Sequence, residues 1–111
     1  MAYDTELADR IRALIGMDPE LTEKAMFGGL AFLINGNMAV AASGHGGLMV
    51  RSDPADSDKM IAAGAELMEM RGRTMPGWLR VYDGLADDDV LRKWVTLGVD
   101  YAHSLPPKMK S

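Results

Sequence analysis

The residues best suited to binding chemistry lie in a glycine-rich loop and in the arginine that follows it. Gly44-His45-Gly46-Gly47 could cradle an anionic ligand, with His45 and the downstream Arg51 as contacting groups. The loop lacks the spacing of a P-loop or a dinucleotide-binding motif, and it is expected to join two strands without opening a helix. A plain flexible connection is the favoured interpretation. A ligand-binding or minor enzymatic site at His45 and Arg51 is the alternative.

The sequence offers few metal ligands or catalytic groups. There is no cysteine, which excludes thiol catalysis, disulfides and cysteine-ligated zinc or iron–sulfur sites. His45 and His103, the two histidines, fall in no recognised zinc-binding pattern. Asp87-Asp88-Asp89 lacks the EF-hand pattern and is explained by capping and dipole compensation at the start of a helix. We therefore expect no metal, no cofactor and no catalytic residue.

Arginines, methionines and a tryptophan gather in the segment whose structure is hardest to assign. A guanidinium donates two parallel hydrogen bonds to a carboxylate or a phosphate, and methionine and tryptophan supply adaptable apolar contact area. Three of these arginines, together with Arg51, could form an anion site or a partner-binding patch: Arg71, Arg73 and Arg80. The interaction patch expected from this segment consists of Arg71, Arg73, Met75, Trp78 and Arg80. The alternative interpretation is a set of solvated arginines around core methionines.

The elements that position these residues are those of one small domain. With 111 residues, of which 48% are hydrophobic and 25% charged, the chain has an ordinary domain's size and composition. We expect a single domain over residues 1–111, with a core from about 5 to 105 and a tail from 106 to 111. Helical spacing of apolar residues predicts a first helix from Asp4 or Thr5 to about Ile15 and a long helix from Asp87 to about Leu105. In the long helix the residues expected to share one face are Leu91, Trp94, Val95, Gly98 and Ala102, and the stripe is widened by Val90, Leu97 and Tyr101.

A middle helix and several strands are expected between those two helices. Asp53-Pro54 opens the middle helix, with Ala55, Met60, Ile61 and Ala63 facing inward. Glu66 to Met70 is either a short strand or an irregular turn. The remaining strands are expected at Leu21–Met26, Leu30–Ile34, Asn37–Ala42, Leu48–Arg51 and Trp78–Tyr82. The resulting fold class is α+β, an antiparallel sheet with a hairpin and flanking helices.

Asn35-Gly36 is the strongest local signal, because a type I′ turn needs positive φ at both central residues. Such a turn pairs Ile34 with Asn37, and a regular ladder then pairs Phe32 with Ala39 and Leu30 with Ala41. Both faces of the hairpin are apolar, so both should be at least partly covered. Helices suit one face. Other segments of the chain or a second subunit, hence a homodimer, suit the other.

Charge and targeting signals limit the partners. The net charge of −4 and the pI of about 5.0 weigh against autonomous binding to duplex DNA. The N-terminus resembles no signal peptide, and the apolar runs are too short to cross a bilayer. The absence of cysteine fits the cytoplasm. We expect a cytoplasmic protein without membrane contact.

The stretch from Lys24 through Gly36 resembles the N-terminal domain of the TfoX (Sxy) family, a group of regulators of natural competence and related small proteins. The later segments follow in the family's order, so the resemblance covers roughly residues 5 to 105. Phe27 is taken as a core anchor, and the glycines are taken to allow the turn. The family motif in this sequence consists of Met26, Phe27, Gly28, Gly29 and Gly36.

The resemblance implies a non-enzymatic regulatory role, without catalytic residues, and is compatible with a homodimer. TfoX proteins act as transcriptional coactivators with the cyclic-AMP receptor protein. A transcription factor or an RNA polymerase component is therefore the implied partner. The family's full-length regulators carry a second, C-terminal domain, which this sequence stops short of. We expect a stand-alone domain that serves as a regulatory or protein-interaction module, and an anionic small-molecule binder is the alternative.

Overall fold

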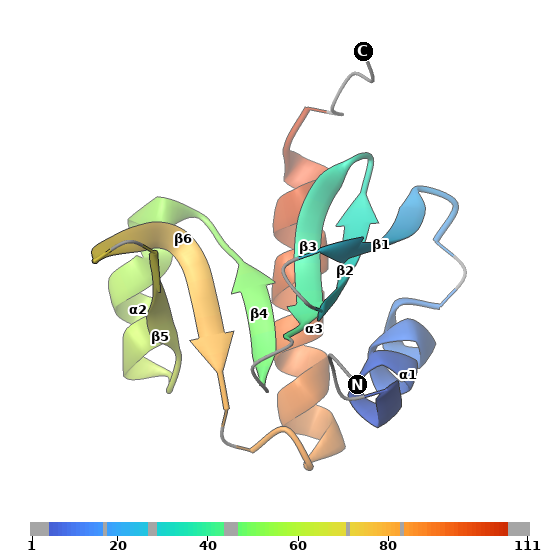
Figure 1. Cartoon of the computed structure of the whole chain (residues 1–111), viewed down its shortest axis with the longest axis horizontal. Coiled ribbons are helices and arrows are strands. Elements are labelled where there is room, and N and C mark those ends of the chain that lie inside the picture. Colours follow the sequence, from blue (N-terminus) through green and yellow to red (C-terminus); the bar gives the residue numbers. More distant parts are fainter. Residues whose placement is uncertain are drawn as a thin grey trace.

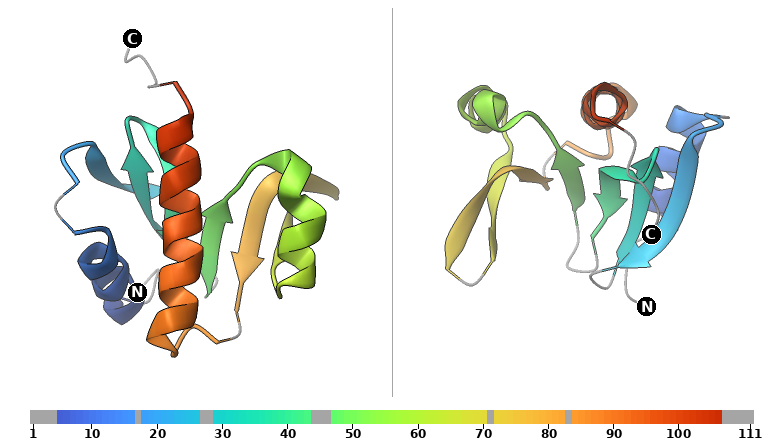
Figure 2. Two further views of the ribbon diagram at one scale, coloured as in Figure 1. Left: turned by 180° about the vertical axis from the view of Figure 1, so that it is seen from behind. Right: turned by 90° about the horizontal axis from the view of Figure 1, so that it is seen from above.

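The computed structural model describes residues 5–16, 18–26, 29–43, 47–70, 72–82 and 84–106. Six strands form one antiparallel sheet in the order β1-β2-β3-β4-β6-β5. The three helices lie on one side of that sheet (Figures 1 and 2), which confirms the predicted α+β class. The elements are α1 (Thr5–Ile15), β1 (Leu21–Met26), β2 (Gly29–Ile34), β3 (Asn37–Ala42), β4 (Leu48–Arg51), α2 (Ser57–Ala62), β5 (Glu66–Met70), β6 (Arg73–Val81) and α3 (Asp88–Ser104).

The first and last helices form where the sequence predicts them. Asp87 caps α3, since its Oδ1 accepts hydrogen bonds from the backbone nitrogens of Asp89 at 2.8 Å and Val90 at 3.3 Å. The predicted inward residues of α3 are all buried: Leu91, Trp94, Val95, Gly98 and Ala102. Within the described residues, no helix combines the length and apolar character needed to cross a bilayer.

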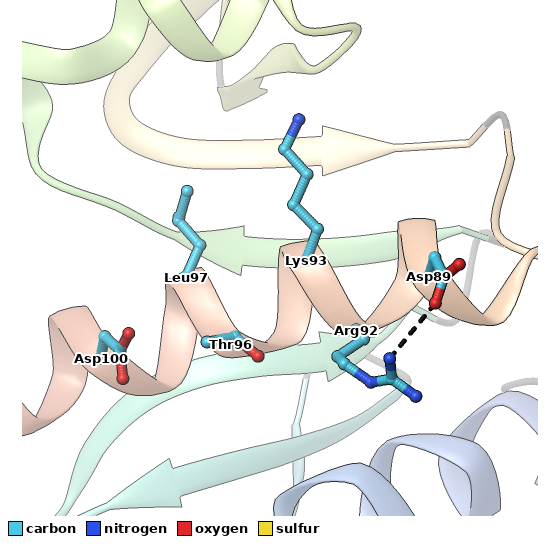
Figure 3. Close-up of a pocket in the computed structure, with 6 residues that line it drawn as sticks. All are labelled: Asp89, Arg92, Lys93, Thr96, Leu97 and Asp100. Carbon is cyan, nitrogen blue, oxygen red and sulfur yellow. Dashed lines mark hydrogen bonds and ion pairs between the residues drawn. The ribbon is translucent and has the colours of Figure 1, made fainter.

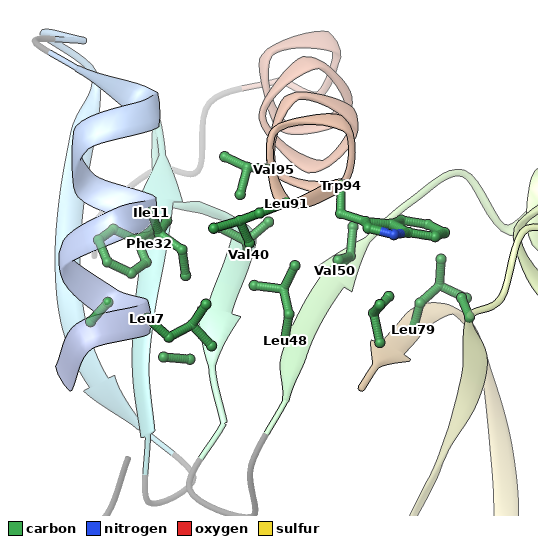
Figure 4. Close-up of a cluster of buried hydrophobic side chains, with 14 residues drawn as sticks. Leu7, Ile11, Phe32, Val40, Leu48, Val50, Leu79, Leu91, Trp94 and Val95 are labelled. Atoms are coloured by element: carbon green, nitrogen blue, oxygen red, sulfur yellow. The ribbon is translucent and has the colours of Figure 1, made fainter. Parts of the chain in front are cut away.

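The main core lies between the helices and the sheet (Figure 4). Trp94 reaches from α3 over Val50 and Leu79, while Ile11 of α1 packs beside Phe32. Full burial of one such side chain stabilises the fold by about 1.5–3 kcal/mol. This core fixes α3 across the middle of the sheet.

The second face of the sheet, away from the helices, is also apolar and already buried. Ala31, Met38, Ala41 and Met49 are all at most 6% exposed, with Leu33 and Trp78 packed against them. In the right panel of Figure 2, β5 and β6 extend away from the helices at one edge of the sheet, whereas β1 rises beside α1 at the other edge. The expectation that both faces are covered is therefore confirmed within a single chain.

The hairpin turn follows the prediction, but the register beyond it does not. Asn35 and Gly36 have φ values of 55° and 83°, as a type I′ turn requires, and Ile34 pairs with Asn37. Further along, Phe32 pairs with Val40 and not with the predicted Ala39.

The same shift pairs Leu30 with Ala42 in place of the predicted Ala41. Ala39 is thus the extra residue of a β-bulge in β3.

The bulge accommodates the close approach of α3. A Cβ atom added to Gly98 would overlap the carbonyl oxygen of Ala39 and lie 2.8 Å from Cγ1 of Val40. The bulge also leaves Val40 on the same face as Phe32, in the core beneath the helices. The register therefore depends on a tertiary contact that the local sequence pattern does not reveal.

The last strand differs from the predicted Trp78–Tyr82. It begins at Arg73 and ends at Val81, and its partner β5 resolves the ambiguity of Glu66 to Met70 in favour of a strand. The pairing of β5 with β6 shifts register between Leu67 and Met68, opposite the Pro76-Gly77 segment. Proline and a positive-φ glycine interrupt a strand pattern, so the first half of β6 was not recognised.

The middle helix is shorter than predicted. A 3₁₀ turn spans Pro54–Asp56 before α2 begins at Ser57, and Asp53 Oδ1 accepts a hydrogen bond from the Ala55 nitrogen at 2.9 Å. Asp53 therefore caps the 3₁₀ turn. Of the residues predicted to face inward, Met60 packs against the core, whereas Ala55, Ile61 and Ala63 are exposed.

Candidate functional site

The predicted interaction patch is described only in part. Arg71 lies outside the described residues, and the side chains of Arg73 and Met75 do too, although their backbone belongs to β6. Trp78 and Arg80 are described. Both point to the side of β6 opposite Leu79, which belongs to the core beneath the helices.

The structure brings Trp78 together with Arg51, which the sequence associates both with the arginines of the patch and with the alternative ligand loop. Arg51 ends β4 and pairs with Trp78 across the sheet. Its guanidinium carbon lies 4.5 Å from the centroid of the Trp78 ring and 5.7 Å from that of Tyr101 in α3. Both distances are within the range of cation–π attraction. Arg51, Trp78 and Tyr101 are called the Arg51 cluster below.

The pairing pattern of the strands explains the position of Arg51. Pairing between β3 and β4 ends at Val40 and Val50, whereas pairing between β4 and β6 continues to Arg51 and Trp78. Arg51 therefore lies where β3 and β4 part, with a strand neighbour on one side.

Gly77 positions Trp78. The Ser52 nitrogen donates a 2.8 Å hydrogen bond to the Gly77 carbonyl, which draws the end of β4 onto β6. A Cβ atom at Gly77 would lie 2.8 Å from the Ser52 carbonyl oxygen and 3.0 Å from Cγ of Pro54, and its φ is 85°. Only glycine fits here without strain, so the contact that fixes Trp78 beside Arg51 depends on Gly77.

Gly98 positions Tyr101 in a similar way. Since Gly98 has no side chain, α3 approaches the bulge of β3 closely. Tyr101 lies three residues further on, about one helical turn, and so extends from the same side of α3. The two rings of the Arg51 cluster are thus each held by a nearby glycine contact.

Among the described residues, no acceptor binds the side chain of Arg51. Its Nε is buried without a partner, as is the Oγ of the next residue, Ser52. Arg51 forms no ion pair or hydrogen bond with any described residue. A buried donor without an acceptor is unfavourable, and such groups in native proteins call for an explanation. The rings compensate the charge in part, and the remaining N–H donors can bind an oxyanion in bidentate fashion.

A second cation lies on the same strand. Arg80 Nη1 donates a 3.0 Å hydrogen bond to Tyr82 Oη, and no carboxylate among the described residues forms an ion pair with it. The Tyr82 side chain lies against Gly47, where a Cβ atom would come within 2.8 Å of its ring. Trp78, Arg80 and Tyr82 therefore alternate along the chain as aromatic, cationic and aromatic groups.

The glycine-rich loop and Arg51 lie at opposite ends of β4. Gly47 precedes Leu48, and three residue steps of about 3.3 Å each separate Leu48 from Arg51. His45 lies outside the described residues, so its pairing with Arg51 stays a prediction.

A cavity of about 320 Å³ lies between α1, Gly47 and Tyr82. Its arginine, Arg10, is already bound to Asp88 Oδ1 at 2.8 Å. This neutralised cation makes the cavity a weaker anion site than the Arg51 cluster.

A larger depression of about 580 Å³ lies along the outer face of α3 (Figure 3). Its lining side chains leave the helix in different directions: Lys93 and Leu97 point toward the β6 side, and Arg92 points toward α1. Arg92 is paired with Asp89 at 3.2 Å. A ligand would meet the side of one helix here and not a set of converging groups.

The acidic and histidine side chains in the described ranges do not assemble a metal site. No group of three or more of them lies together there. His103 Nε2 lies 2.8 Å from Asp18 Oδ2 and ties the end of α3 to the loop before β1. The pKa of Asp18 is lowered by a hydrogen bond from the backbone nitrogen of Glu20 and then by His103. Asp87, Asp88 and Asp89 serve the start of α3, where Asp87 is the cap.

Most of the family motif falls on a segment that is only partly described. Phe27 and Gly28 lie outside the described residues, as does the side chain of Met26. Gly29 opens β2 opposite Met26 and is not a positive-φ residue, so it belongs to the strand and not to the turn. Gly36 occupies the second position of the β2–β3 turn with positive φ, as expected.

Comparison with known proteins identifies the family. The sequence profile of the TfoX N-terminal domain matches residues 14–102, which include the hairpin and all three residues of the Arg51 cluster. No curated protein and no solved structure gives a significant match. Because the matched residues make up well over half of the 111-residue chain, the protein belongs to the TfoX N-terminal domain family.

Proposed function

We propose that this chain is a non-enzymatic regulatory module that acts by binding another protein through the Arg51 cluster and Arg80. The observation that carries the proposal is the Arg51 guanidinium, which lies over two aromatic rings and donates to no acceptor in the described chain. Tryptophan, tyrosine and arginine are the residues that contribute most energy at protein interfaces. The cluster combines one of each.

Family membership supports a regulatory role and suggests the class of partner. A transcription factor or an RNA polymerase component is the proposed partner, because TfoX proteins work as transcriptional coactivators. The net charge of −4 supports action through such a partner in preference to direct binding of duplex DNA. The absence of cysteine supports a cytoplasmic location.

The test is an affinity pull-down from native lysate with the wild-type chain, Arg51→Ala and Arg92→Ala. Arg92→Ala is the matched control, because it removes an exposed arginine that is already paired with Asp89. Recovery of a transcription factor or polymerase component by the wild type and the control, and its loss with Arg51→Ala, would support the proposal. Equal recovery by all three chains would reject this placement of the surface.

An anionic small molecule is the second candidate, because it would also supply the acceptor that Arg51 lacks. A ligand that binds the folded state raises the melting temperature, so a thermal-shift screen with nucleotides and phosphorylated metabolites tests it. Stabilisation by millimolar ligand that disappears in Arg51→Ala would favour this candidate over a protein partner.

A homodimer through the second sheet face has less support. Ala31, Met38 and Met49 are buried in the single chain and offer little additional apolar area to a second copy. Light scattering at high protein concentration should therefore show a monomer, and a dimer would contradict this expectation.

A further inference from the structure

We propose that the Arg51 cluster is a carboxylate-binding site that receives an aspartate or glutamate side chain from an acidic segment of the protein partner. This inference rests on the proposed function and adds the chemistry of the partner. It is supported by the ion pairs that other arginines of the chain form, by the orientation of the Arg51 guanidinium, and by the charge around Arg51.

Three other described arginines, unlike Arg51 and Arg80, form ion pairs with carboxylates of the chain. Arg10 lies 2.8 Å from Asp88, Arg12 lies 2.7 Å from Glu23, and Arg92 lies 3.2 Å from Asp89. Each of the three is bound to a carboxylate of the chain. Arg12 also lies near an aromatic ring, that of Phe32, at 6.0 Å. Arg51 differs in having no carboxylate partner among the described residues, so its donors can bind a carboxylate from outside.

The two rings prepare Arg51 for a partner that approaches the edge of its guanidinium. A cation over the face of an aromatic ring directs its N–H groups outward along its own plane, because the ring occupies the space above that plane. Trp78 at 4.5 Å and Tyr101 at 5.7 Å restrict the side chain in this way. A restricted guanidinium loses less entropy on binding, and a carboxylate matches its fork with two parallel hydrogen bonds.

The local charge favours a carboxylate over a phosphate dianion. Within the cluster itself Arg51 supplies one positive charge, which a carboxylate balances, and the second cation, Arg80, lies at the neighbouring Met49–Arg80 pair. Tyr101 lies in the last turn of α3, which ends at Ser104, and the C-terminal end of a helix carries partial negative charge. No long helix begins at the cluster to add backbone N–H donors for a phosphate.

Arg80 provides a second cation for an acidic segment that binds at Arg51. It lies two residues from Trp78 on the same side of β6 and pairs in register with Met49, the neighbour of Arg51 on that side of β4. Its donors are engaged by Tyr82 alone among the described residues. A peptide with one acidic residue at Arg51 and a second nearby would therefore find a matching cation.

The experiment is a selection of random twelve-residue peptides displayed on phage against the intact wild-type chain. The binding of selected peptides is then measured by fluorescence anisotropy. We expect the enriched peptides to contain aspartate or glutamate. Replacing the acidic residue by Asn or Gln should weaken binding about tenfold or more, as expected for the loss of a charge-assisted bidentate pair. Arg51→Ala should weaken it similarly, and Arg92→Ala should not.

Two controls keep the result interpretable. Circular dichroism and thermal unfolding establish that Arg51→Ala is folded, and Arg51→Lys retains the charge without the fork, so it should bind more weakly than the wild type. Added acetate and inorganic phosphate compete as free ions. Competition by phosphate at lower concentration than acetate would overturn the carboxylate assignment and favour a phosphorylated small molecule.

The outcomes separate this inference from the proposed function. Peptides that bind through Arg51 but contain no acidic residue would overturn the carboxylate site and leave the interaction surface intact. Peptides that bind Arg51→Ala as well as the wild type would overturn both the site and its placement. A selection without any enriched peptide, together with an empty pull-down, would overturn the protein-binding function itself.

Discussion

The guanidinium groups at the two sides of the sheet have different partners. On the α1 side, Arg12 binds Glu23 at 2.7 Å and Asp9 at 2.6 Å. On the β4–β6 side, Arg51 lies against Trp78 and has no acceptor in the described chain.

The first arrangement neutralises the cation and ties a helix to an edge strand, although an exposed pair of this kind contributes little stability. The second leaves a half-buried cation whose donors can be used by another molecule. Arg12 is thus engaged by carboxylates of its own chain, whereas Arg51 is suited to bind another molecule. Four predictions test this difference.

The largest expected effect is that of Gly98→Ala. The added methyl group would overlap the Ala39 carbonyl and Val40, so α3 must move away from the sheet. Overpacking of this kind should lower the free energy of unfolding by about 3 kcal/mol or more, measured by urea denaturation. Thr96→Ala on the exposed face of the same helix is the control, with a change within about 0.5 kcal/mol. A Gly98→Ala chain as stable as this control would refute the close contact.

Gly77→Ala should have the next largest effect. Gly77 and Gly72 both have positive φ, 85° and 77°, but only Gly77 faces a close neighbour, the Ser52 carbonyl. Gly72→Ala reports the backbone strain alone, about 1 kcal/mol, and Gly77→Ala should cost about 1–3 kcal/mol more. Gly77→Ala should also weaken partner binding, because it displaces Trp78. Equal destabilisation by the two variants would contradict the proposed role of Gly77.

Replacement by methionine should change the free energy of unfolding differently at Arg51 and at Arg12. Arg51→Met keeps the apolar contact with both rings and removes a buried donor without an acceptor. The free energy of unfolding should therefore stay unchanged or rise by about 1 kcal/mol. Arg12→Met should lower it, because Glu23 loses its partner. The measurement is urea denaturation at low salt. A loss above about 2 kcal/mol in Arg51→Met would show that Arg51 is structural after all.

The smallest expected effect is on the pH dependence of stability. It concerns Glu23 and Asp18, on the side of the sheet where Arg12 is paired. The pKa of Glu23 is lowered by the hydrogen bond from Arg12, and that of Asp18 by the Glu20 backbone nitrogen and then His103. The folded chain thus binds fewer protons than the unfolded chain, so this stability is present above about pH 4.5 and is lost as pH falls through the lowered values. Unfolding midpoints between about pH 6 and 2 should show a shallower acid loss in Asp18→Asn and Glu23→Gln. An unchanged slope would contradict the prediction.

The sequence predicted those parts of the fold whose signals are local. The cap at Asp87, the stripe of α3 and the turn at Asn35-Gly36 each depend on neighbouring residues, and all three are confirmed. The register of the hairpin was predicted wrongly, because it shifts at Ala39, which lies against Gly98, a residue far away in the chain.

The candidate site was predicted in pieces. Arg51 and Trp78 were each singled out, but Arg51 was left out of the final interaction patch, because the pairing of β4 with β6 is not visible in a linear sequence. Tyr101 was assigned to the apolar stripe of α3. Its position at the edge of that stripe could have indicated a role at the site, because a side chain there can reach beyond the core.

The most direct test of the account is the affinity of a selected acidic peptide for the wild-type chain and for Arg51→Met, measured by fluorescence anisotropy. Arg51→Met should lose affinity by about tenfold or more while remaining at least as stable as the wild type. Unchanged affinity in a folded Arg51→Met chain would contradict the claim that Arg51 is reserved for recognition.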